Sequence, residues 1–198
     1  MKIMSEKEVL NVYKSIGALL EGHFVLSSGL HSRMYLQSAL IFSNTTIAES
    51  LCGSLAQKLQ SVININDIDL VVSPAMGGVI VGYELSRNIK KPNIFAERKE
   101  GKFSIRRGFE INKGQKILVV EDIVTTGKSS LECFECIRDL GGEVICEAAL
   151  INRGGNSVDL GVPLVTLANL NIPNYDSNDL PEDLKNVPAI KPGSRPSK

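Results

Sequence analysis

The chain has 198 residues, of which 43% are hydrophobic and 22% charged, an ordinary composition for one folded domain with a buried core. Basic and acidic side chains number 22 each, so the chain lacks the cationic excess of proteins that grip a nucleic-acid backbone, and we expect no nucleic-acid partner. No run of about 18 apolar residues occurs, and the polar start does not resemble a signal peptide. We therefore expect a cytoplasmic protein with no membrane partner and reduced thiols.

The first third of the chain is predicted to form a helix, a strand-and-turn region and a second helix. Ser5 and Glu8 form a capping box for a helix that we expect to reach about Leu20. Residues 24–37 are predicted as strand and turn, and the second helix is expected over 44–59.

From residue 68 onward, short apolar runs alternate with helical patterns and glycine-containing turns. Strands are predicted over 68–72, 93–97, 116–120, 144–152 and 164–167, with helices over 79–88 and 128–140. This alternation is typical of an α/β fold with a central, mostly parallel sheet flanked by helices. In such folds ligands bind at the carboxyl ends of the strands.

The domain organisation is predicted from the distribution of proline. Five of the eight prolines lie after residue 170. We expect a single domain over residues 1–170 and a proline-rich carboxy-terminal segment over 171–198. The tail from Pro188 is expected to be extended and partly disordered.

Cys133 and Cys136 form a C-x-x-C pair inside a predicted helix. No second Cys or His pair stands at ligand spacing, which a metal site would need. We interpret these residues as small buried thiols and not as a metal or redox centre.

The segment Ile117–Ser130 carries the clearest chemical pattern: a buried strand, two acids, a loop of hydroxyl residues with one glycine, and the start of a helix. Free N–H groups at a helix start, together with hydroxyls, form a cradle for a phosphate dianion. A nucleotide-binding P-loop would need glycine where Asp122 stands. The carboxylates of Glu121 and Asp122 suit a pair of sugar hydroxyls instead. The pattern predicts a ribose 5-phosphate site; the alternative is an ordinary strand-to-helix turn capped by one of the hydroxyls.

This segment resembles the ribose-phosphate-binding motif of type I phosphoribosyltransferases, with its two acids, two further residues and Thr-Thr-Gly. Residues 24–35 resemble the amino-terminal signature of orotate phosphoribosyltransferases, and residues 97–102 resemble their basic mobile loop. Ile151-Asn152-Arg153 matches the strand end where that family places an arginine. The resemblance spans residues 5–155 and implies the type I phosphoribosyltransferase fold, with a small hood formed largely by residues 1–40.

The resemblance also implies a reaction. The ribose 5-phosphate group of phosphoribosyl pyrophosphate passes to orotate, giving orotidine 5′-monophosphate and pyrophosphate on the route to uridine nucleotides. The implied cofactor is Mg²⁺, held mainly by pyrophosphate and water with no protein ligand. The implied transition state is a ribose cation with pyrophosphate largely detached. Catalysis therefore requires positive charge next to the leaving pyrophosphate and exclusion of water from the site.

Residue roles follow from the same resemblance. The implied catalytic residues are Asp122, Lys102 and Glu121. The implied phosphoribosyl pyrophosphate-binding residues are Arg98, Lys99, Lys102, Glu121, Asp122, Ile123, Val124, Thr125, Thr126, Gly127, Lys128 and Ser129. The implied orotate-binding residues are Thr125, Arg153, Ser27 and Ser28. Lys102 is the candidate for a lid lysine that reaches the neighbouring subunit's site, which implies a homodimer. From the residues alone, the charges of 98–113 favour a solvated hairpin, and Arg153 fits a surface arginine equally well.

Three positions depart from the pattern common in the family. Ser27 stands where many members have lysine, Met76-Gly77 where many have an aromatic residue and lysine, and Ser104 where a histidine is common. These differences remove positive charge from the expected pyrophosphate and base sites. Arg106-Arg107 is a candidate to compensate for that loss.

Three rival functions remain open. A phosphoribosyltransferase for a purine or for uracil would share the sugar motif, although a neutral base would not need Arg153. A regulator that binds phosphoribosyl pyrophosphate or a nucleotide as a signal should show a basic face or an added DNA-binding domain; the neutral net charge and the lack of a spare domain argue against it. An inactive scaffold would leave the two acids and the basic loop unexplained.

Overall fold

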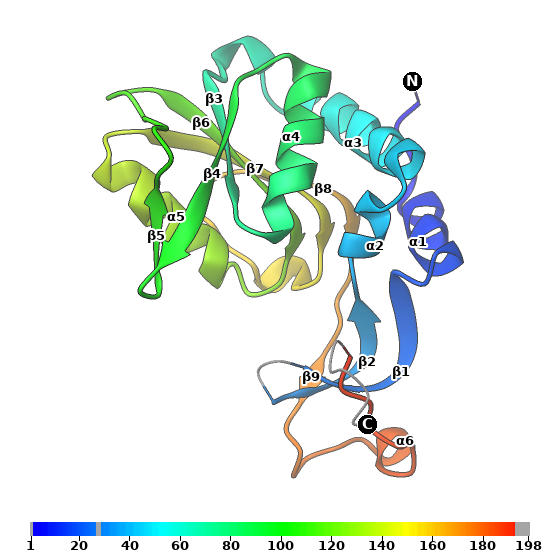
Figure 1. The fold of residues 1–198 in the computed structure, drawn as a ribbon. Helices are drawn as coiled ribbons and strands as arrows, with labels where there is room; N and C mark the ends of the chain where they lie inside the picture. Colours follow the sequence, from blue (N-terminus) through cyan, green and yellow to red (C-terminus); the bar gives the residue numbers. More distant parts are fainter. Residues whose placement is uncertain (1, 27–28, 193–198) are drawn as a thin grey trace.

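The computed structural model describes residues 2–26 and 29–192, which form an α/β core and a smaller hood (Figure 1). The core sheet has the strand order β5-β4-β3-β6-β7-β8. Five strands run parallel, and β5 pairs antiparallel with β4 at the edge. The strands are β3 (Leu70–Pro74), β4 (Asn93–Lys99), β5 (Lys102–Ile105), β6 (Lys116–Val124), β7 (Glu143–Asn152) and β8 (Leu164–Asn169). The predicted fold class, a mostly parallel sheet flanked by helices, is confirmed.

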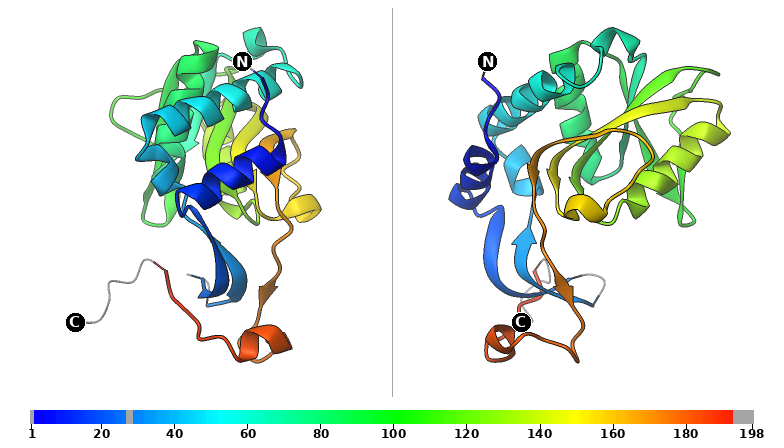
Figure 2. Two further views of the ribbon diagram at one scale, coloured as in Figure 1. Left: turned by 90° about the vertical axis from the view of Figure 1, so that its right-hand side faces the viewer. Right: turned by 180° about the vertical axis from the view of Figure 1, so that it is seen from behind.

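Helices cover both faces of this sheet (Figures 1 and 2). One face carries α1 (Glu6–Ser15), α3 (Thr45–Gln60) and α4 (Gly77–Ile89), and the other carries α5 (Lys128–Asp139). Along β6, Leu118 and Val120 pack in the cluster of the first face, while Val119 packs with Phe134 of α5. Burial on both faces explains why β6 is a continuous apolar run and does not alternate with polar residues.

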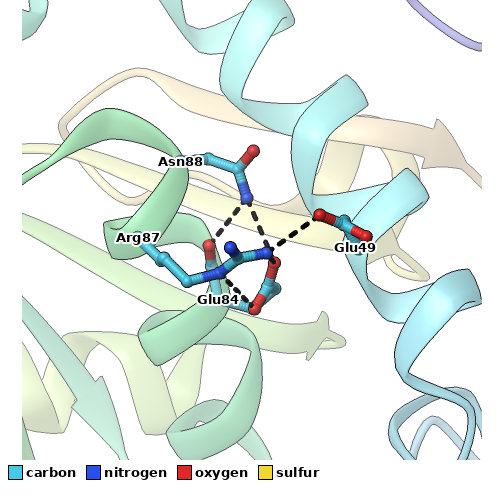
Figure 3. A network of polar contacts seen from close by, with 4 residues as sticks. All are labelled: Glu49, Glu84, Arg87 and Asn88. Atoms are coloured by element: carbon cyan, nitrogen blue, oxygen red, sulfur yellow. Dashed lines mark hydrogen bonds and ion pairs between the residues drawn. The ribbon is translucent and has the colours of Figure 1, made fainter.

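A polar network on the surface joins α3 to α4 (Figure 3). The Arg87 guanidinium donates to Glu49 Oε1 at 3.1 Å and to Glu84 Oε1 at 2.7 Å. Asn88 Nδ2 donates to the Glu84 carbonyl at 2.8 Å. Because Arg87 is exposed, we attribute the packing of these helices mainly to their apolar contacts and not to this network.

The hood is a small antiparallel sheet below the core in Figure 1. Its strands are β1 (Leu19–Val25), β2 (His31–Leu36) and β9 (Asn174–Tyr175), in that order. The short helices α2 (Ala39–Phe42) and α6 (Glu182–Lys185) complete the described helices, with 3-10 turns at Ile65–Asp67 and Gly155–Ser157. The sequence assigned the hood largely to residues 1–40, and the structure adds the carboxy-terminal segment, because β9 pairs with β2.

The first helix is shorter than predicted. Its capping box is confirmed, since Ser5 N donates to Glu8 Oε2 at 2.7 Å and Glu8 N donates to Ser5 Oγ at 3.3 Å. The helix ends at Ser15 and does not reach Leu20. Gly17 takes a φ of 70°, which glycine adopts readily, and turns the chain so that Leu20 joins strand β1.

Within the described residues, no helix combines the length and apolar character needed to cross a membrane.

Candidate active site

The loop between β6 and α5 is the segment that the sequence predicts to bind a phosphate. Thr125 and Thr126 are exposed, and Gly127 occupies the N-cap position of α5 with a φ of 76°. A Cβ at Gly127 would lie 2.7 Å from the Leu160 side chain, so glycine is required here for space as well as for conformation. Gly127 provides no capping side chain, and Lys128 N makes only a long contact of 3.4 Å with Thr126 Oγ1. The start of α5 therefore retains N–H groups that an anion could bind.

Glu121 and Asp122 precede this loop at the end of β6. Burial, followed by the neighbouring charges of Asp122 and Glu147, raises the pKa of Glu121 to about 9. Burial also raises the pKa of Asp122, against hydrogen bonds from backbone amides and from the Ser38 hydroxyl that lower it. Burial therefore opposes ionisation of both carboxyls, and ligand hydroxyls that donate to them would favour the charged forms.

The turn at the start of α4 lies directly against these two acids. A Cβ at Gly77 would fall 2.6 Å from Asp122 Oδ1, and one at Gly78 would fall 3.2 Å from Glu121 Oε2. The lysine common at the position of Gly77 could not be placed without moving Asp122. Met76, in contrast, is 83% exposed and does not replace that lysine's charge.

A cavity of about 560 Å³ lies where the carboxyl ends of β6 and β7 meet the hood. Apolar walls with a few convergent polar groups are typical of small-molecule sites. The core contributes Asp122, Ile123, Thr125, Thr126 and Arg153; the hood contributes Val25, Leu26, Leu30, Met34, Tyr35 and Leu36; and the carboxy-terminal segment contributes Asn174, Lys191 and Pro192.

Arg153 lies at the end of β7 and is held by the hood. Its Nη2 donates to Ser32 Oγ at 2.9 Å and to Asn174 Oδ1 at 2.8 Å. Its Nε is buried without a hydrogen-bond partner among the described residues, and burial lowers the pKa of the guanidinium. Because the two hydrogen-bond acceptors are neutral, the positive charge is available to an anionic ligand, unlike that of an ordinary surface arginine.

The predicted basic loop is a hairpin formed by β4 and β5. Its two-residue turn, Glu100-Gly101, has φ values of 53° and 84°, as tight hairpins require. Arg98 lies beside α5, where Nη2 contacts Ser129 Oγ at 3.5 Å and Glu132 Oε2 at 2.5 Å. Lys99 and Lys102 flank the turn and are exposed.

The hairpin does not bring Lys102 into the cavity of Asp122. Lys102 lines a separate cavity of about 250 Å³ with Glu132 and Glu135, between the hairpin and α5. Its predicted catalytic role therefore requires movement of the hairpin or contact with another subunit's site.

Several other predicted positions are placed as follows. Val124 is buried and does not line the cavity; its carbonyl accepts from Arg153 N at 2.7 Å. The Lys128 ammonium points to solvent 3.9 Å from Glu132. Arg107 donates to both carboxylate oxygens of Glu97, at 2.9 and 2.7 Å, so it is engaged away from the cavity.

Ser27 and Ser28, predicted to contact orotate, lie outside the described residues. Leu26 and Leu30, on either side of them, line the cavity. Ser104, at the position where the family often has histidine, donates to the Glu97 carbonyl at 3.3 Å.

Asn174 and Lys191 are cavity residues that the sequence did not reveal. Both follow the last core strand in a segment without a recognisable motif. The proline content of this segment suggested a tail, and only the pairing with the hood brings these residues to the site.

The cysteines are all free thiols; Cys133 is buried and Cys136 half-buried, as expected for packing residues. Among residues 2–26 and 29–192, no group of three or more His, Cys, Asp or Glu side chains has the arrangement of a metal site.

Comparison with known proteins agrees with this geometry. Residues 41–160 match the phosphoribosyl transferase domain. The orotate phosphoribosyltransferase of Caulobacter vibrioides (strain NA1000 / CB15N) is 48% identical over 192 residues, which cover 97% of this chain and 98% of the relative. That of Sphingopyxis alaskensis is 51% identical over 193 residues, with 97% and 98% coverage. The chain belongs to the orotate phosphoribosyltransferase family.

Solved structures support the same family fold. The crystal structure of orotate phosphoribosyltransferase from Aeropyrum pernix matches with a TM-score of 0.70 and 27% identity, over 82% of this chain and 93% of that one. An adenine phosphoribosyltransferase from Thermoanaerobacter pseudethanolicus matches with a TM-score of 0.57 over 69% of this chain and 88% of that one, and at 15% identity it shares the fold alone. The resemblance drawn from the motifs is confirmed.

Proposed function

We propose that this chain transfers the ribose 5-phosphate group of phosphoribosyl pyrophosphate to orotate, giving orotidine 5′-monophosphate and pyrophosphate. The observation that carries the proposal is that Asp122, the hydroxyl loop Thr125-Thr126 and Arg153 line one cavity between the core and the hood. A sugar-phosphate cradle and a half-buried guanidinium in one cavity suit a phosphorylated sugar and an acidic pyrimidine together.

Each part of the cavity has a role in this reaction. The α5 N-terminus and the hydroxyls of Thr125 and Thr126 bind the 5′-phosphate, and Glu121 and Asp122 hold the ribose hydroxyls. Arg153 binds the orotate carboxylate and orients the ring nitrogen toward C1 of the ribose. The new C–N bond forms as the C1–O bond breaks, pyrophosphate leaves with the electron pair of that bond, and the proton of the ring N–H passes to the pyrophosphate or to water.

Exclusion of water is the hood's contribution. A ribose cation reacts readily with water, so the apolar hood wall of Leu26, Leu30 and Met34 protects it during transfer. Orotate bound between this wall and Arg153 is then the nucleophile nearest to C1.

Mg²⁺ is the proposed cofactor, and the chain has suitable oxygen donors for it. Glu121 and Asp122 stand next to the phosphate cradle, and carboxylates with phosphate oxygens and water are the ligands that Mg²⁺ prefers. When bound, the ion neutralises charge on the leaving pyrophosphate. We expect pyrophosphate and water to be its main ligands.

Orotate absorbance tests the function directly. We expect purified protein to consume orotate only with both phosphoribosyl pyrophosphate and Mg²⁺ present, releasing matching pyrophosphate. Asp122→Asn should lower the rate, whereas Glu143→Gln, an exposed acid at the start of β7, should not. Turnover of another base in place of orotate would refute the assignment of orotate as the substrate. No turnover of any base, despite tight binding of phosphoribosyl pyrophosphate, would favour a regulatory function over an enzymatic one.

We also propose a homodimer in which the hairpin serves the neighbouring site. Two observations support it: Lys102 lies outside its own cavity, and α4 presents an apolar stripe of Met76, Ile80 and Tyr83 that is 83%, 52% and 65% exposed. Positions separated by four and three residues lie on one side of a helix, so a second copy could cover the stripe.

Mixed dimers test the shared site. Lys102→Ala and Asp122→Asn should each be nearly inactive alone, but an equal mixture after subunit exchange should recover about a quarter of wild-type activity, because one site in four is intact. No recovery would refute sharing. Tyr83→Glu should yield monomers by light scattering if the stripe is the interface.

A cytoplasmic location completes the proposal, and the free thiols of the chain agree with a reducing compartment.

A further inference from the structure

The carboxy-terminal strap, residues 187–192, runs along the hood and forms part of the cavity wall. Ile190 N donates to the His23 carbonyl at 2.8 Å, and Val25 N donates to the Ile190 carbonyl at 2.9 Å. The Val187 carbonyl lies 2.7 Å from His23 Nδ1. These hydrogen bonds fix the backbone immediately before Lys191, so tertiary contacts determine the position of this residue beside the cavity.

Lys191 brings a second positive charge to the cavity that Arg153 lines. Among the described residues of its wall, these two are the cationic ones and Asp122 is the acidic one. Arg153 Nη2 already donates to Ser32 and Asn174, so its capacity to bind a carboxylate is partly used. An anionic ring with several acceptors needs further donors, and a lysine ammonium is a donor of the right charge.

The strap and the apolar hood wall share this cavity. Leu26 and Leu30 of the hood line it together with Lys191. The strap therefore adds a positive charge to a largely apolar part of the cavity wall.

We propose that Lys191 is an orotate-binding residue that supplies a second positive charge beside Arg153 in the cavity. The proposal rests on the proposed function, since it concerns the base site of the same cavity. It assigns the strap a role in base binding and not in phosphoribosyl pyrophosphate binding, because Lys191 reaches the cavity from the hood.

The test compares Lys191→Ala and Lys191→Arg with the control Lys185→Ala. Lys185 lies on α6 in the same segment and pairs with Glu182 at 2.5 Å, outside the cavity wall. We expect Lys191→Ala to raise the KM for orotate about tenfold, as loss of a charge-assisted hydrogen bond would. Lys191→Arg should largely restore it, and Lys185→Ala should match wild type.

The remaining readouts separate binding from folding. The KM for phosphoribosyl pyrophosphate and the thermal midpoint of Lys191→Ala should match those of wild type, and calorimetric titration should show weaker orotate binding. An unchanged KM for orotate, or a rise only in the KM for phosphoribosyl pyrophosphate, would refute the proposed role of Lys191 and leave the proposed function untouched. A wild-type protein that does not use orotate would overturn the proposed function itself.

Discussion

Glu147 is a buried carboxyl behind the phosphate cradle. Its Oε1 accepts from Ser130 Oγ at 2.8 Å, while its Oε2 has no hydrogen-bond partner among the described residues. Burial is the main cause that raises the pKa of Glu147 from 4.5 to about 7. The ionised carboxylate is therefore a cost to the folded state at neutral pH.

Replacing Glu147 with glutamine should remove this cost. The pKa of Glu147 is higher in the folded protein than in the unfolded chain, so the folded protein binds more protons than the unfolded chain between pH 4.5 and 7. The free energy of unfolding therefore falls as pH rises through that window. At about 1.4 kcal/mol for each pKa unit, the loss is on the order of 3 kcal/mol above pH 7. Glutamine keeps the shape and the bond from Ser130 but cannot ionise.

Urea denaturation at pH 4.5 and pH 8 would measure the effect. Glu147→Gln and wild type should unfold at similar urea concentrations at pH 4.5, and the variant should be more stable by about 3 kcal/mol at pH 8. Glu143→Gln, at the exposed start of the same strand, is the matched control and should show no such difference. Equal stability of Glu147→Gln and wild type at both pH values would refute the reasoning.

The same substitution should also act on the active site. The Glu147 charge contributes to the raised pKa of Glu121, so its removal should lower that pKa. If ionised Glu121 holds the ribose hydroxyls, the rise of activity with pH should move to lower pH in Glu147→Gln. An unchanged pH profile would show that Glu121 ionisation does not limit the reaction.

Other substitutions test separate parts of the site. Gly127→Ala forces a side chain into a positive φ and against Leu160, so we expect a loss of about 1 to 2 kcal/mol in urea denaturation and at least a tenfold rise in the KM for phosphoribosyl pyrophosphate; normal kinetics would contradict the cradle. Arg153→Lys should raise the KM for orotate about tenfold and leave that for phosphoribosyl pyrophosphate unchanged, and an equal rise in both would argue against a carboxylate contact. Tyr13→Phe removes the 3.3 Å contact between the buried hydroxyls of Tyr13 and Ser38, and should cost about 1 kcal/mol in urea denaturation; an unchanged midpoint would show that the pair is not a hydrogen bond.

The sequence alone determined the parts of this protein whose signals are local. The apolar run of β6, the two acids near its end and the Thr-Thr-Gly loop are contiguous, so spacing along the chain predicted the strand, the loop and the helix that follows them. The Ser5 capping box is likewise a three-residue relation that needs no tertiary contact. The end of the same helix was misjudged because Leu20 fits a helical pattern equally well, and only pairing with β2 makes it a strand residue.

The tertiary structure decided how the base site is assembled. Arg153 is oriented by Ser32 and Asn174, which lie 121 and 21 residues away in the sequence, and no local pattern encodes those contacts. Lys191 reaches the cavity because Ile190 bonds to strand β1, across a segment whose composition indicated only a proline-rich tail. Hydrogen bonds between distant backbone segments depend on the folded positions of both partners, and so the carboxy-terminal part of the hood could be recognised only in the folded chain.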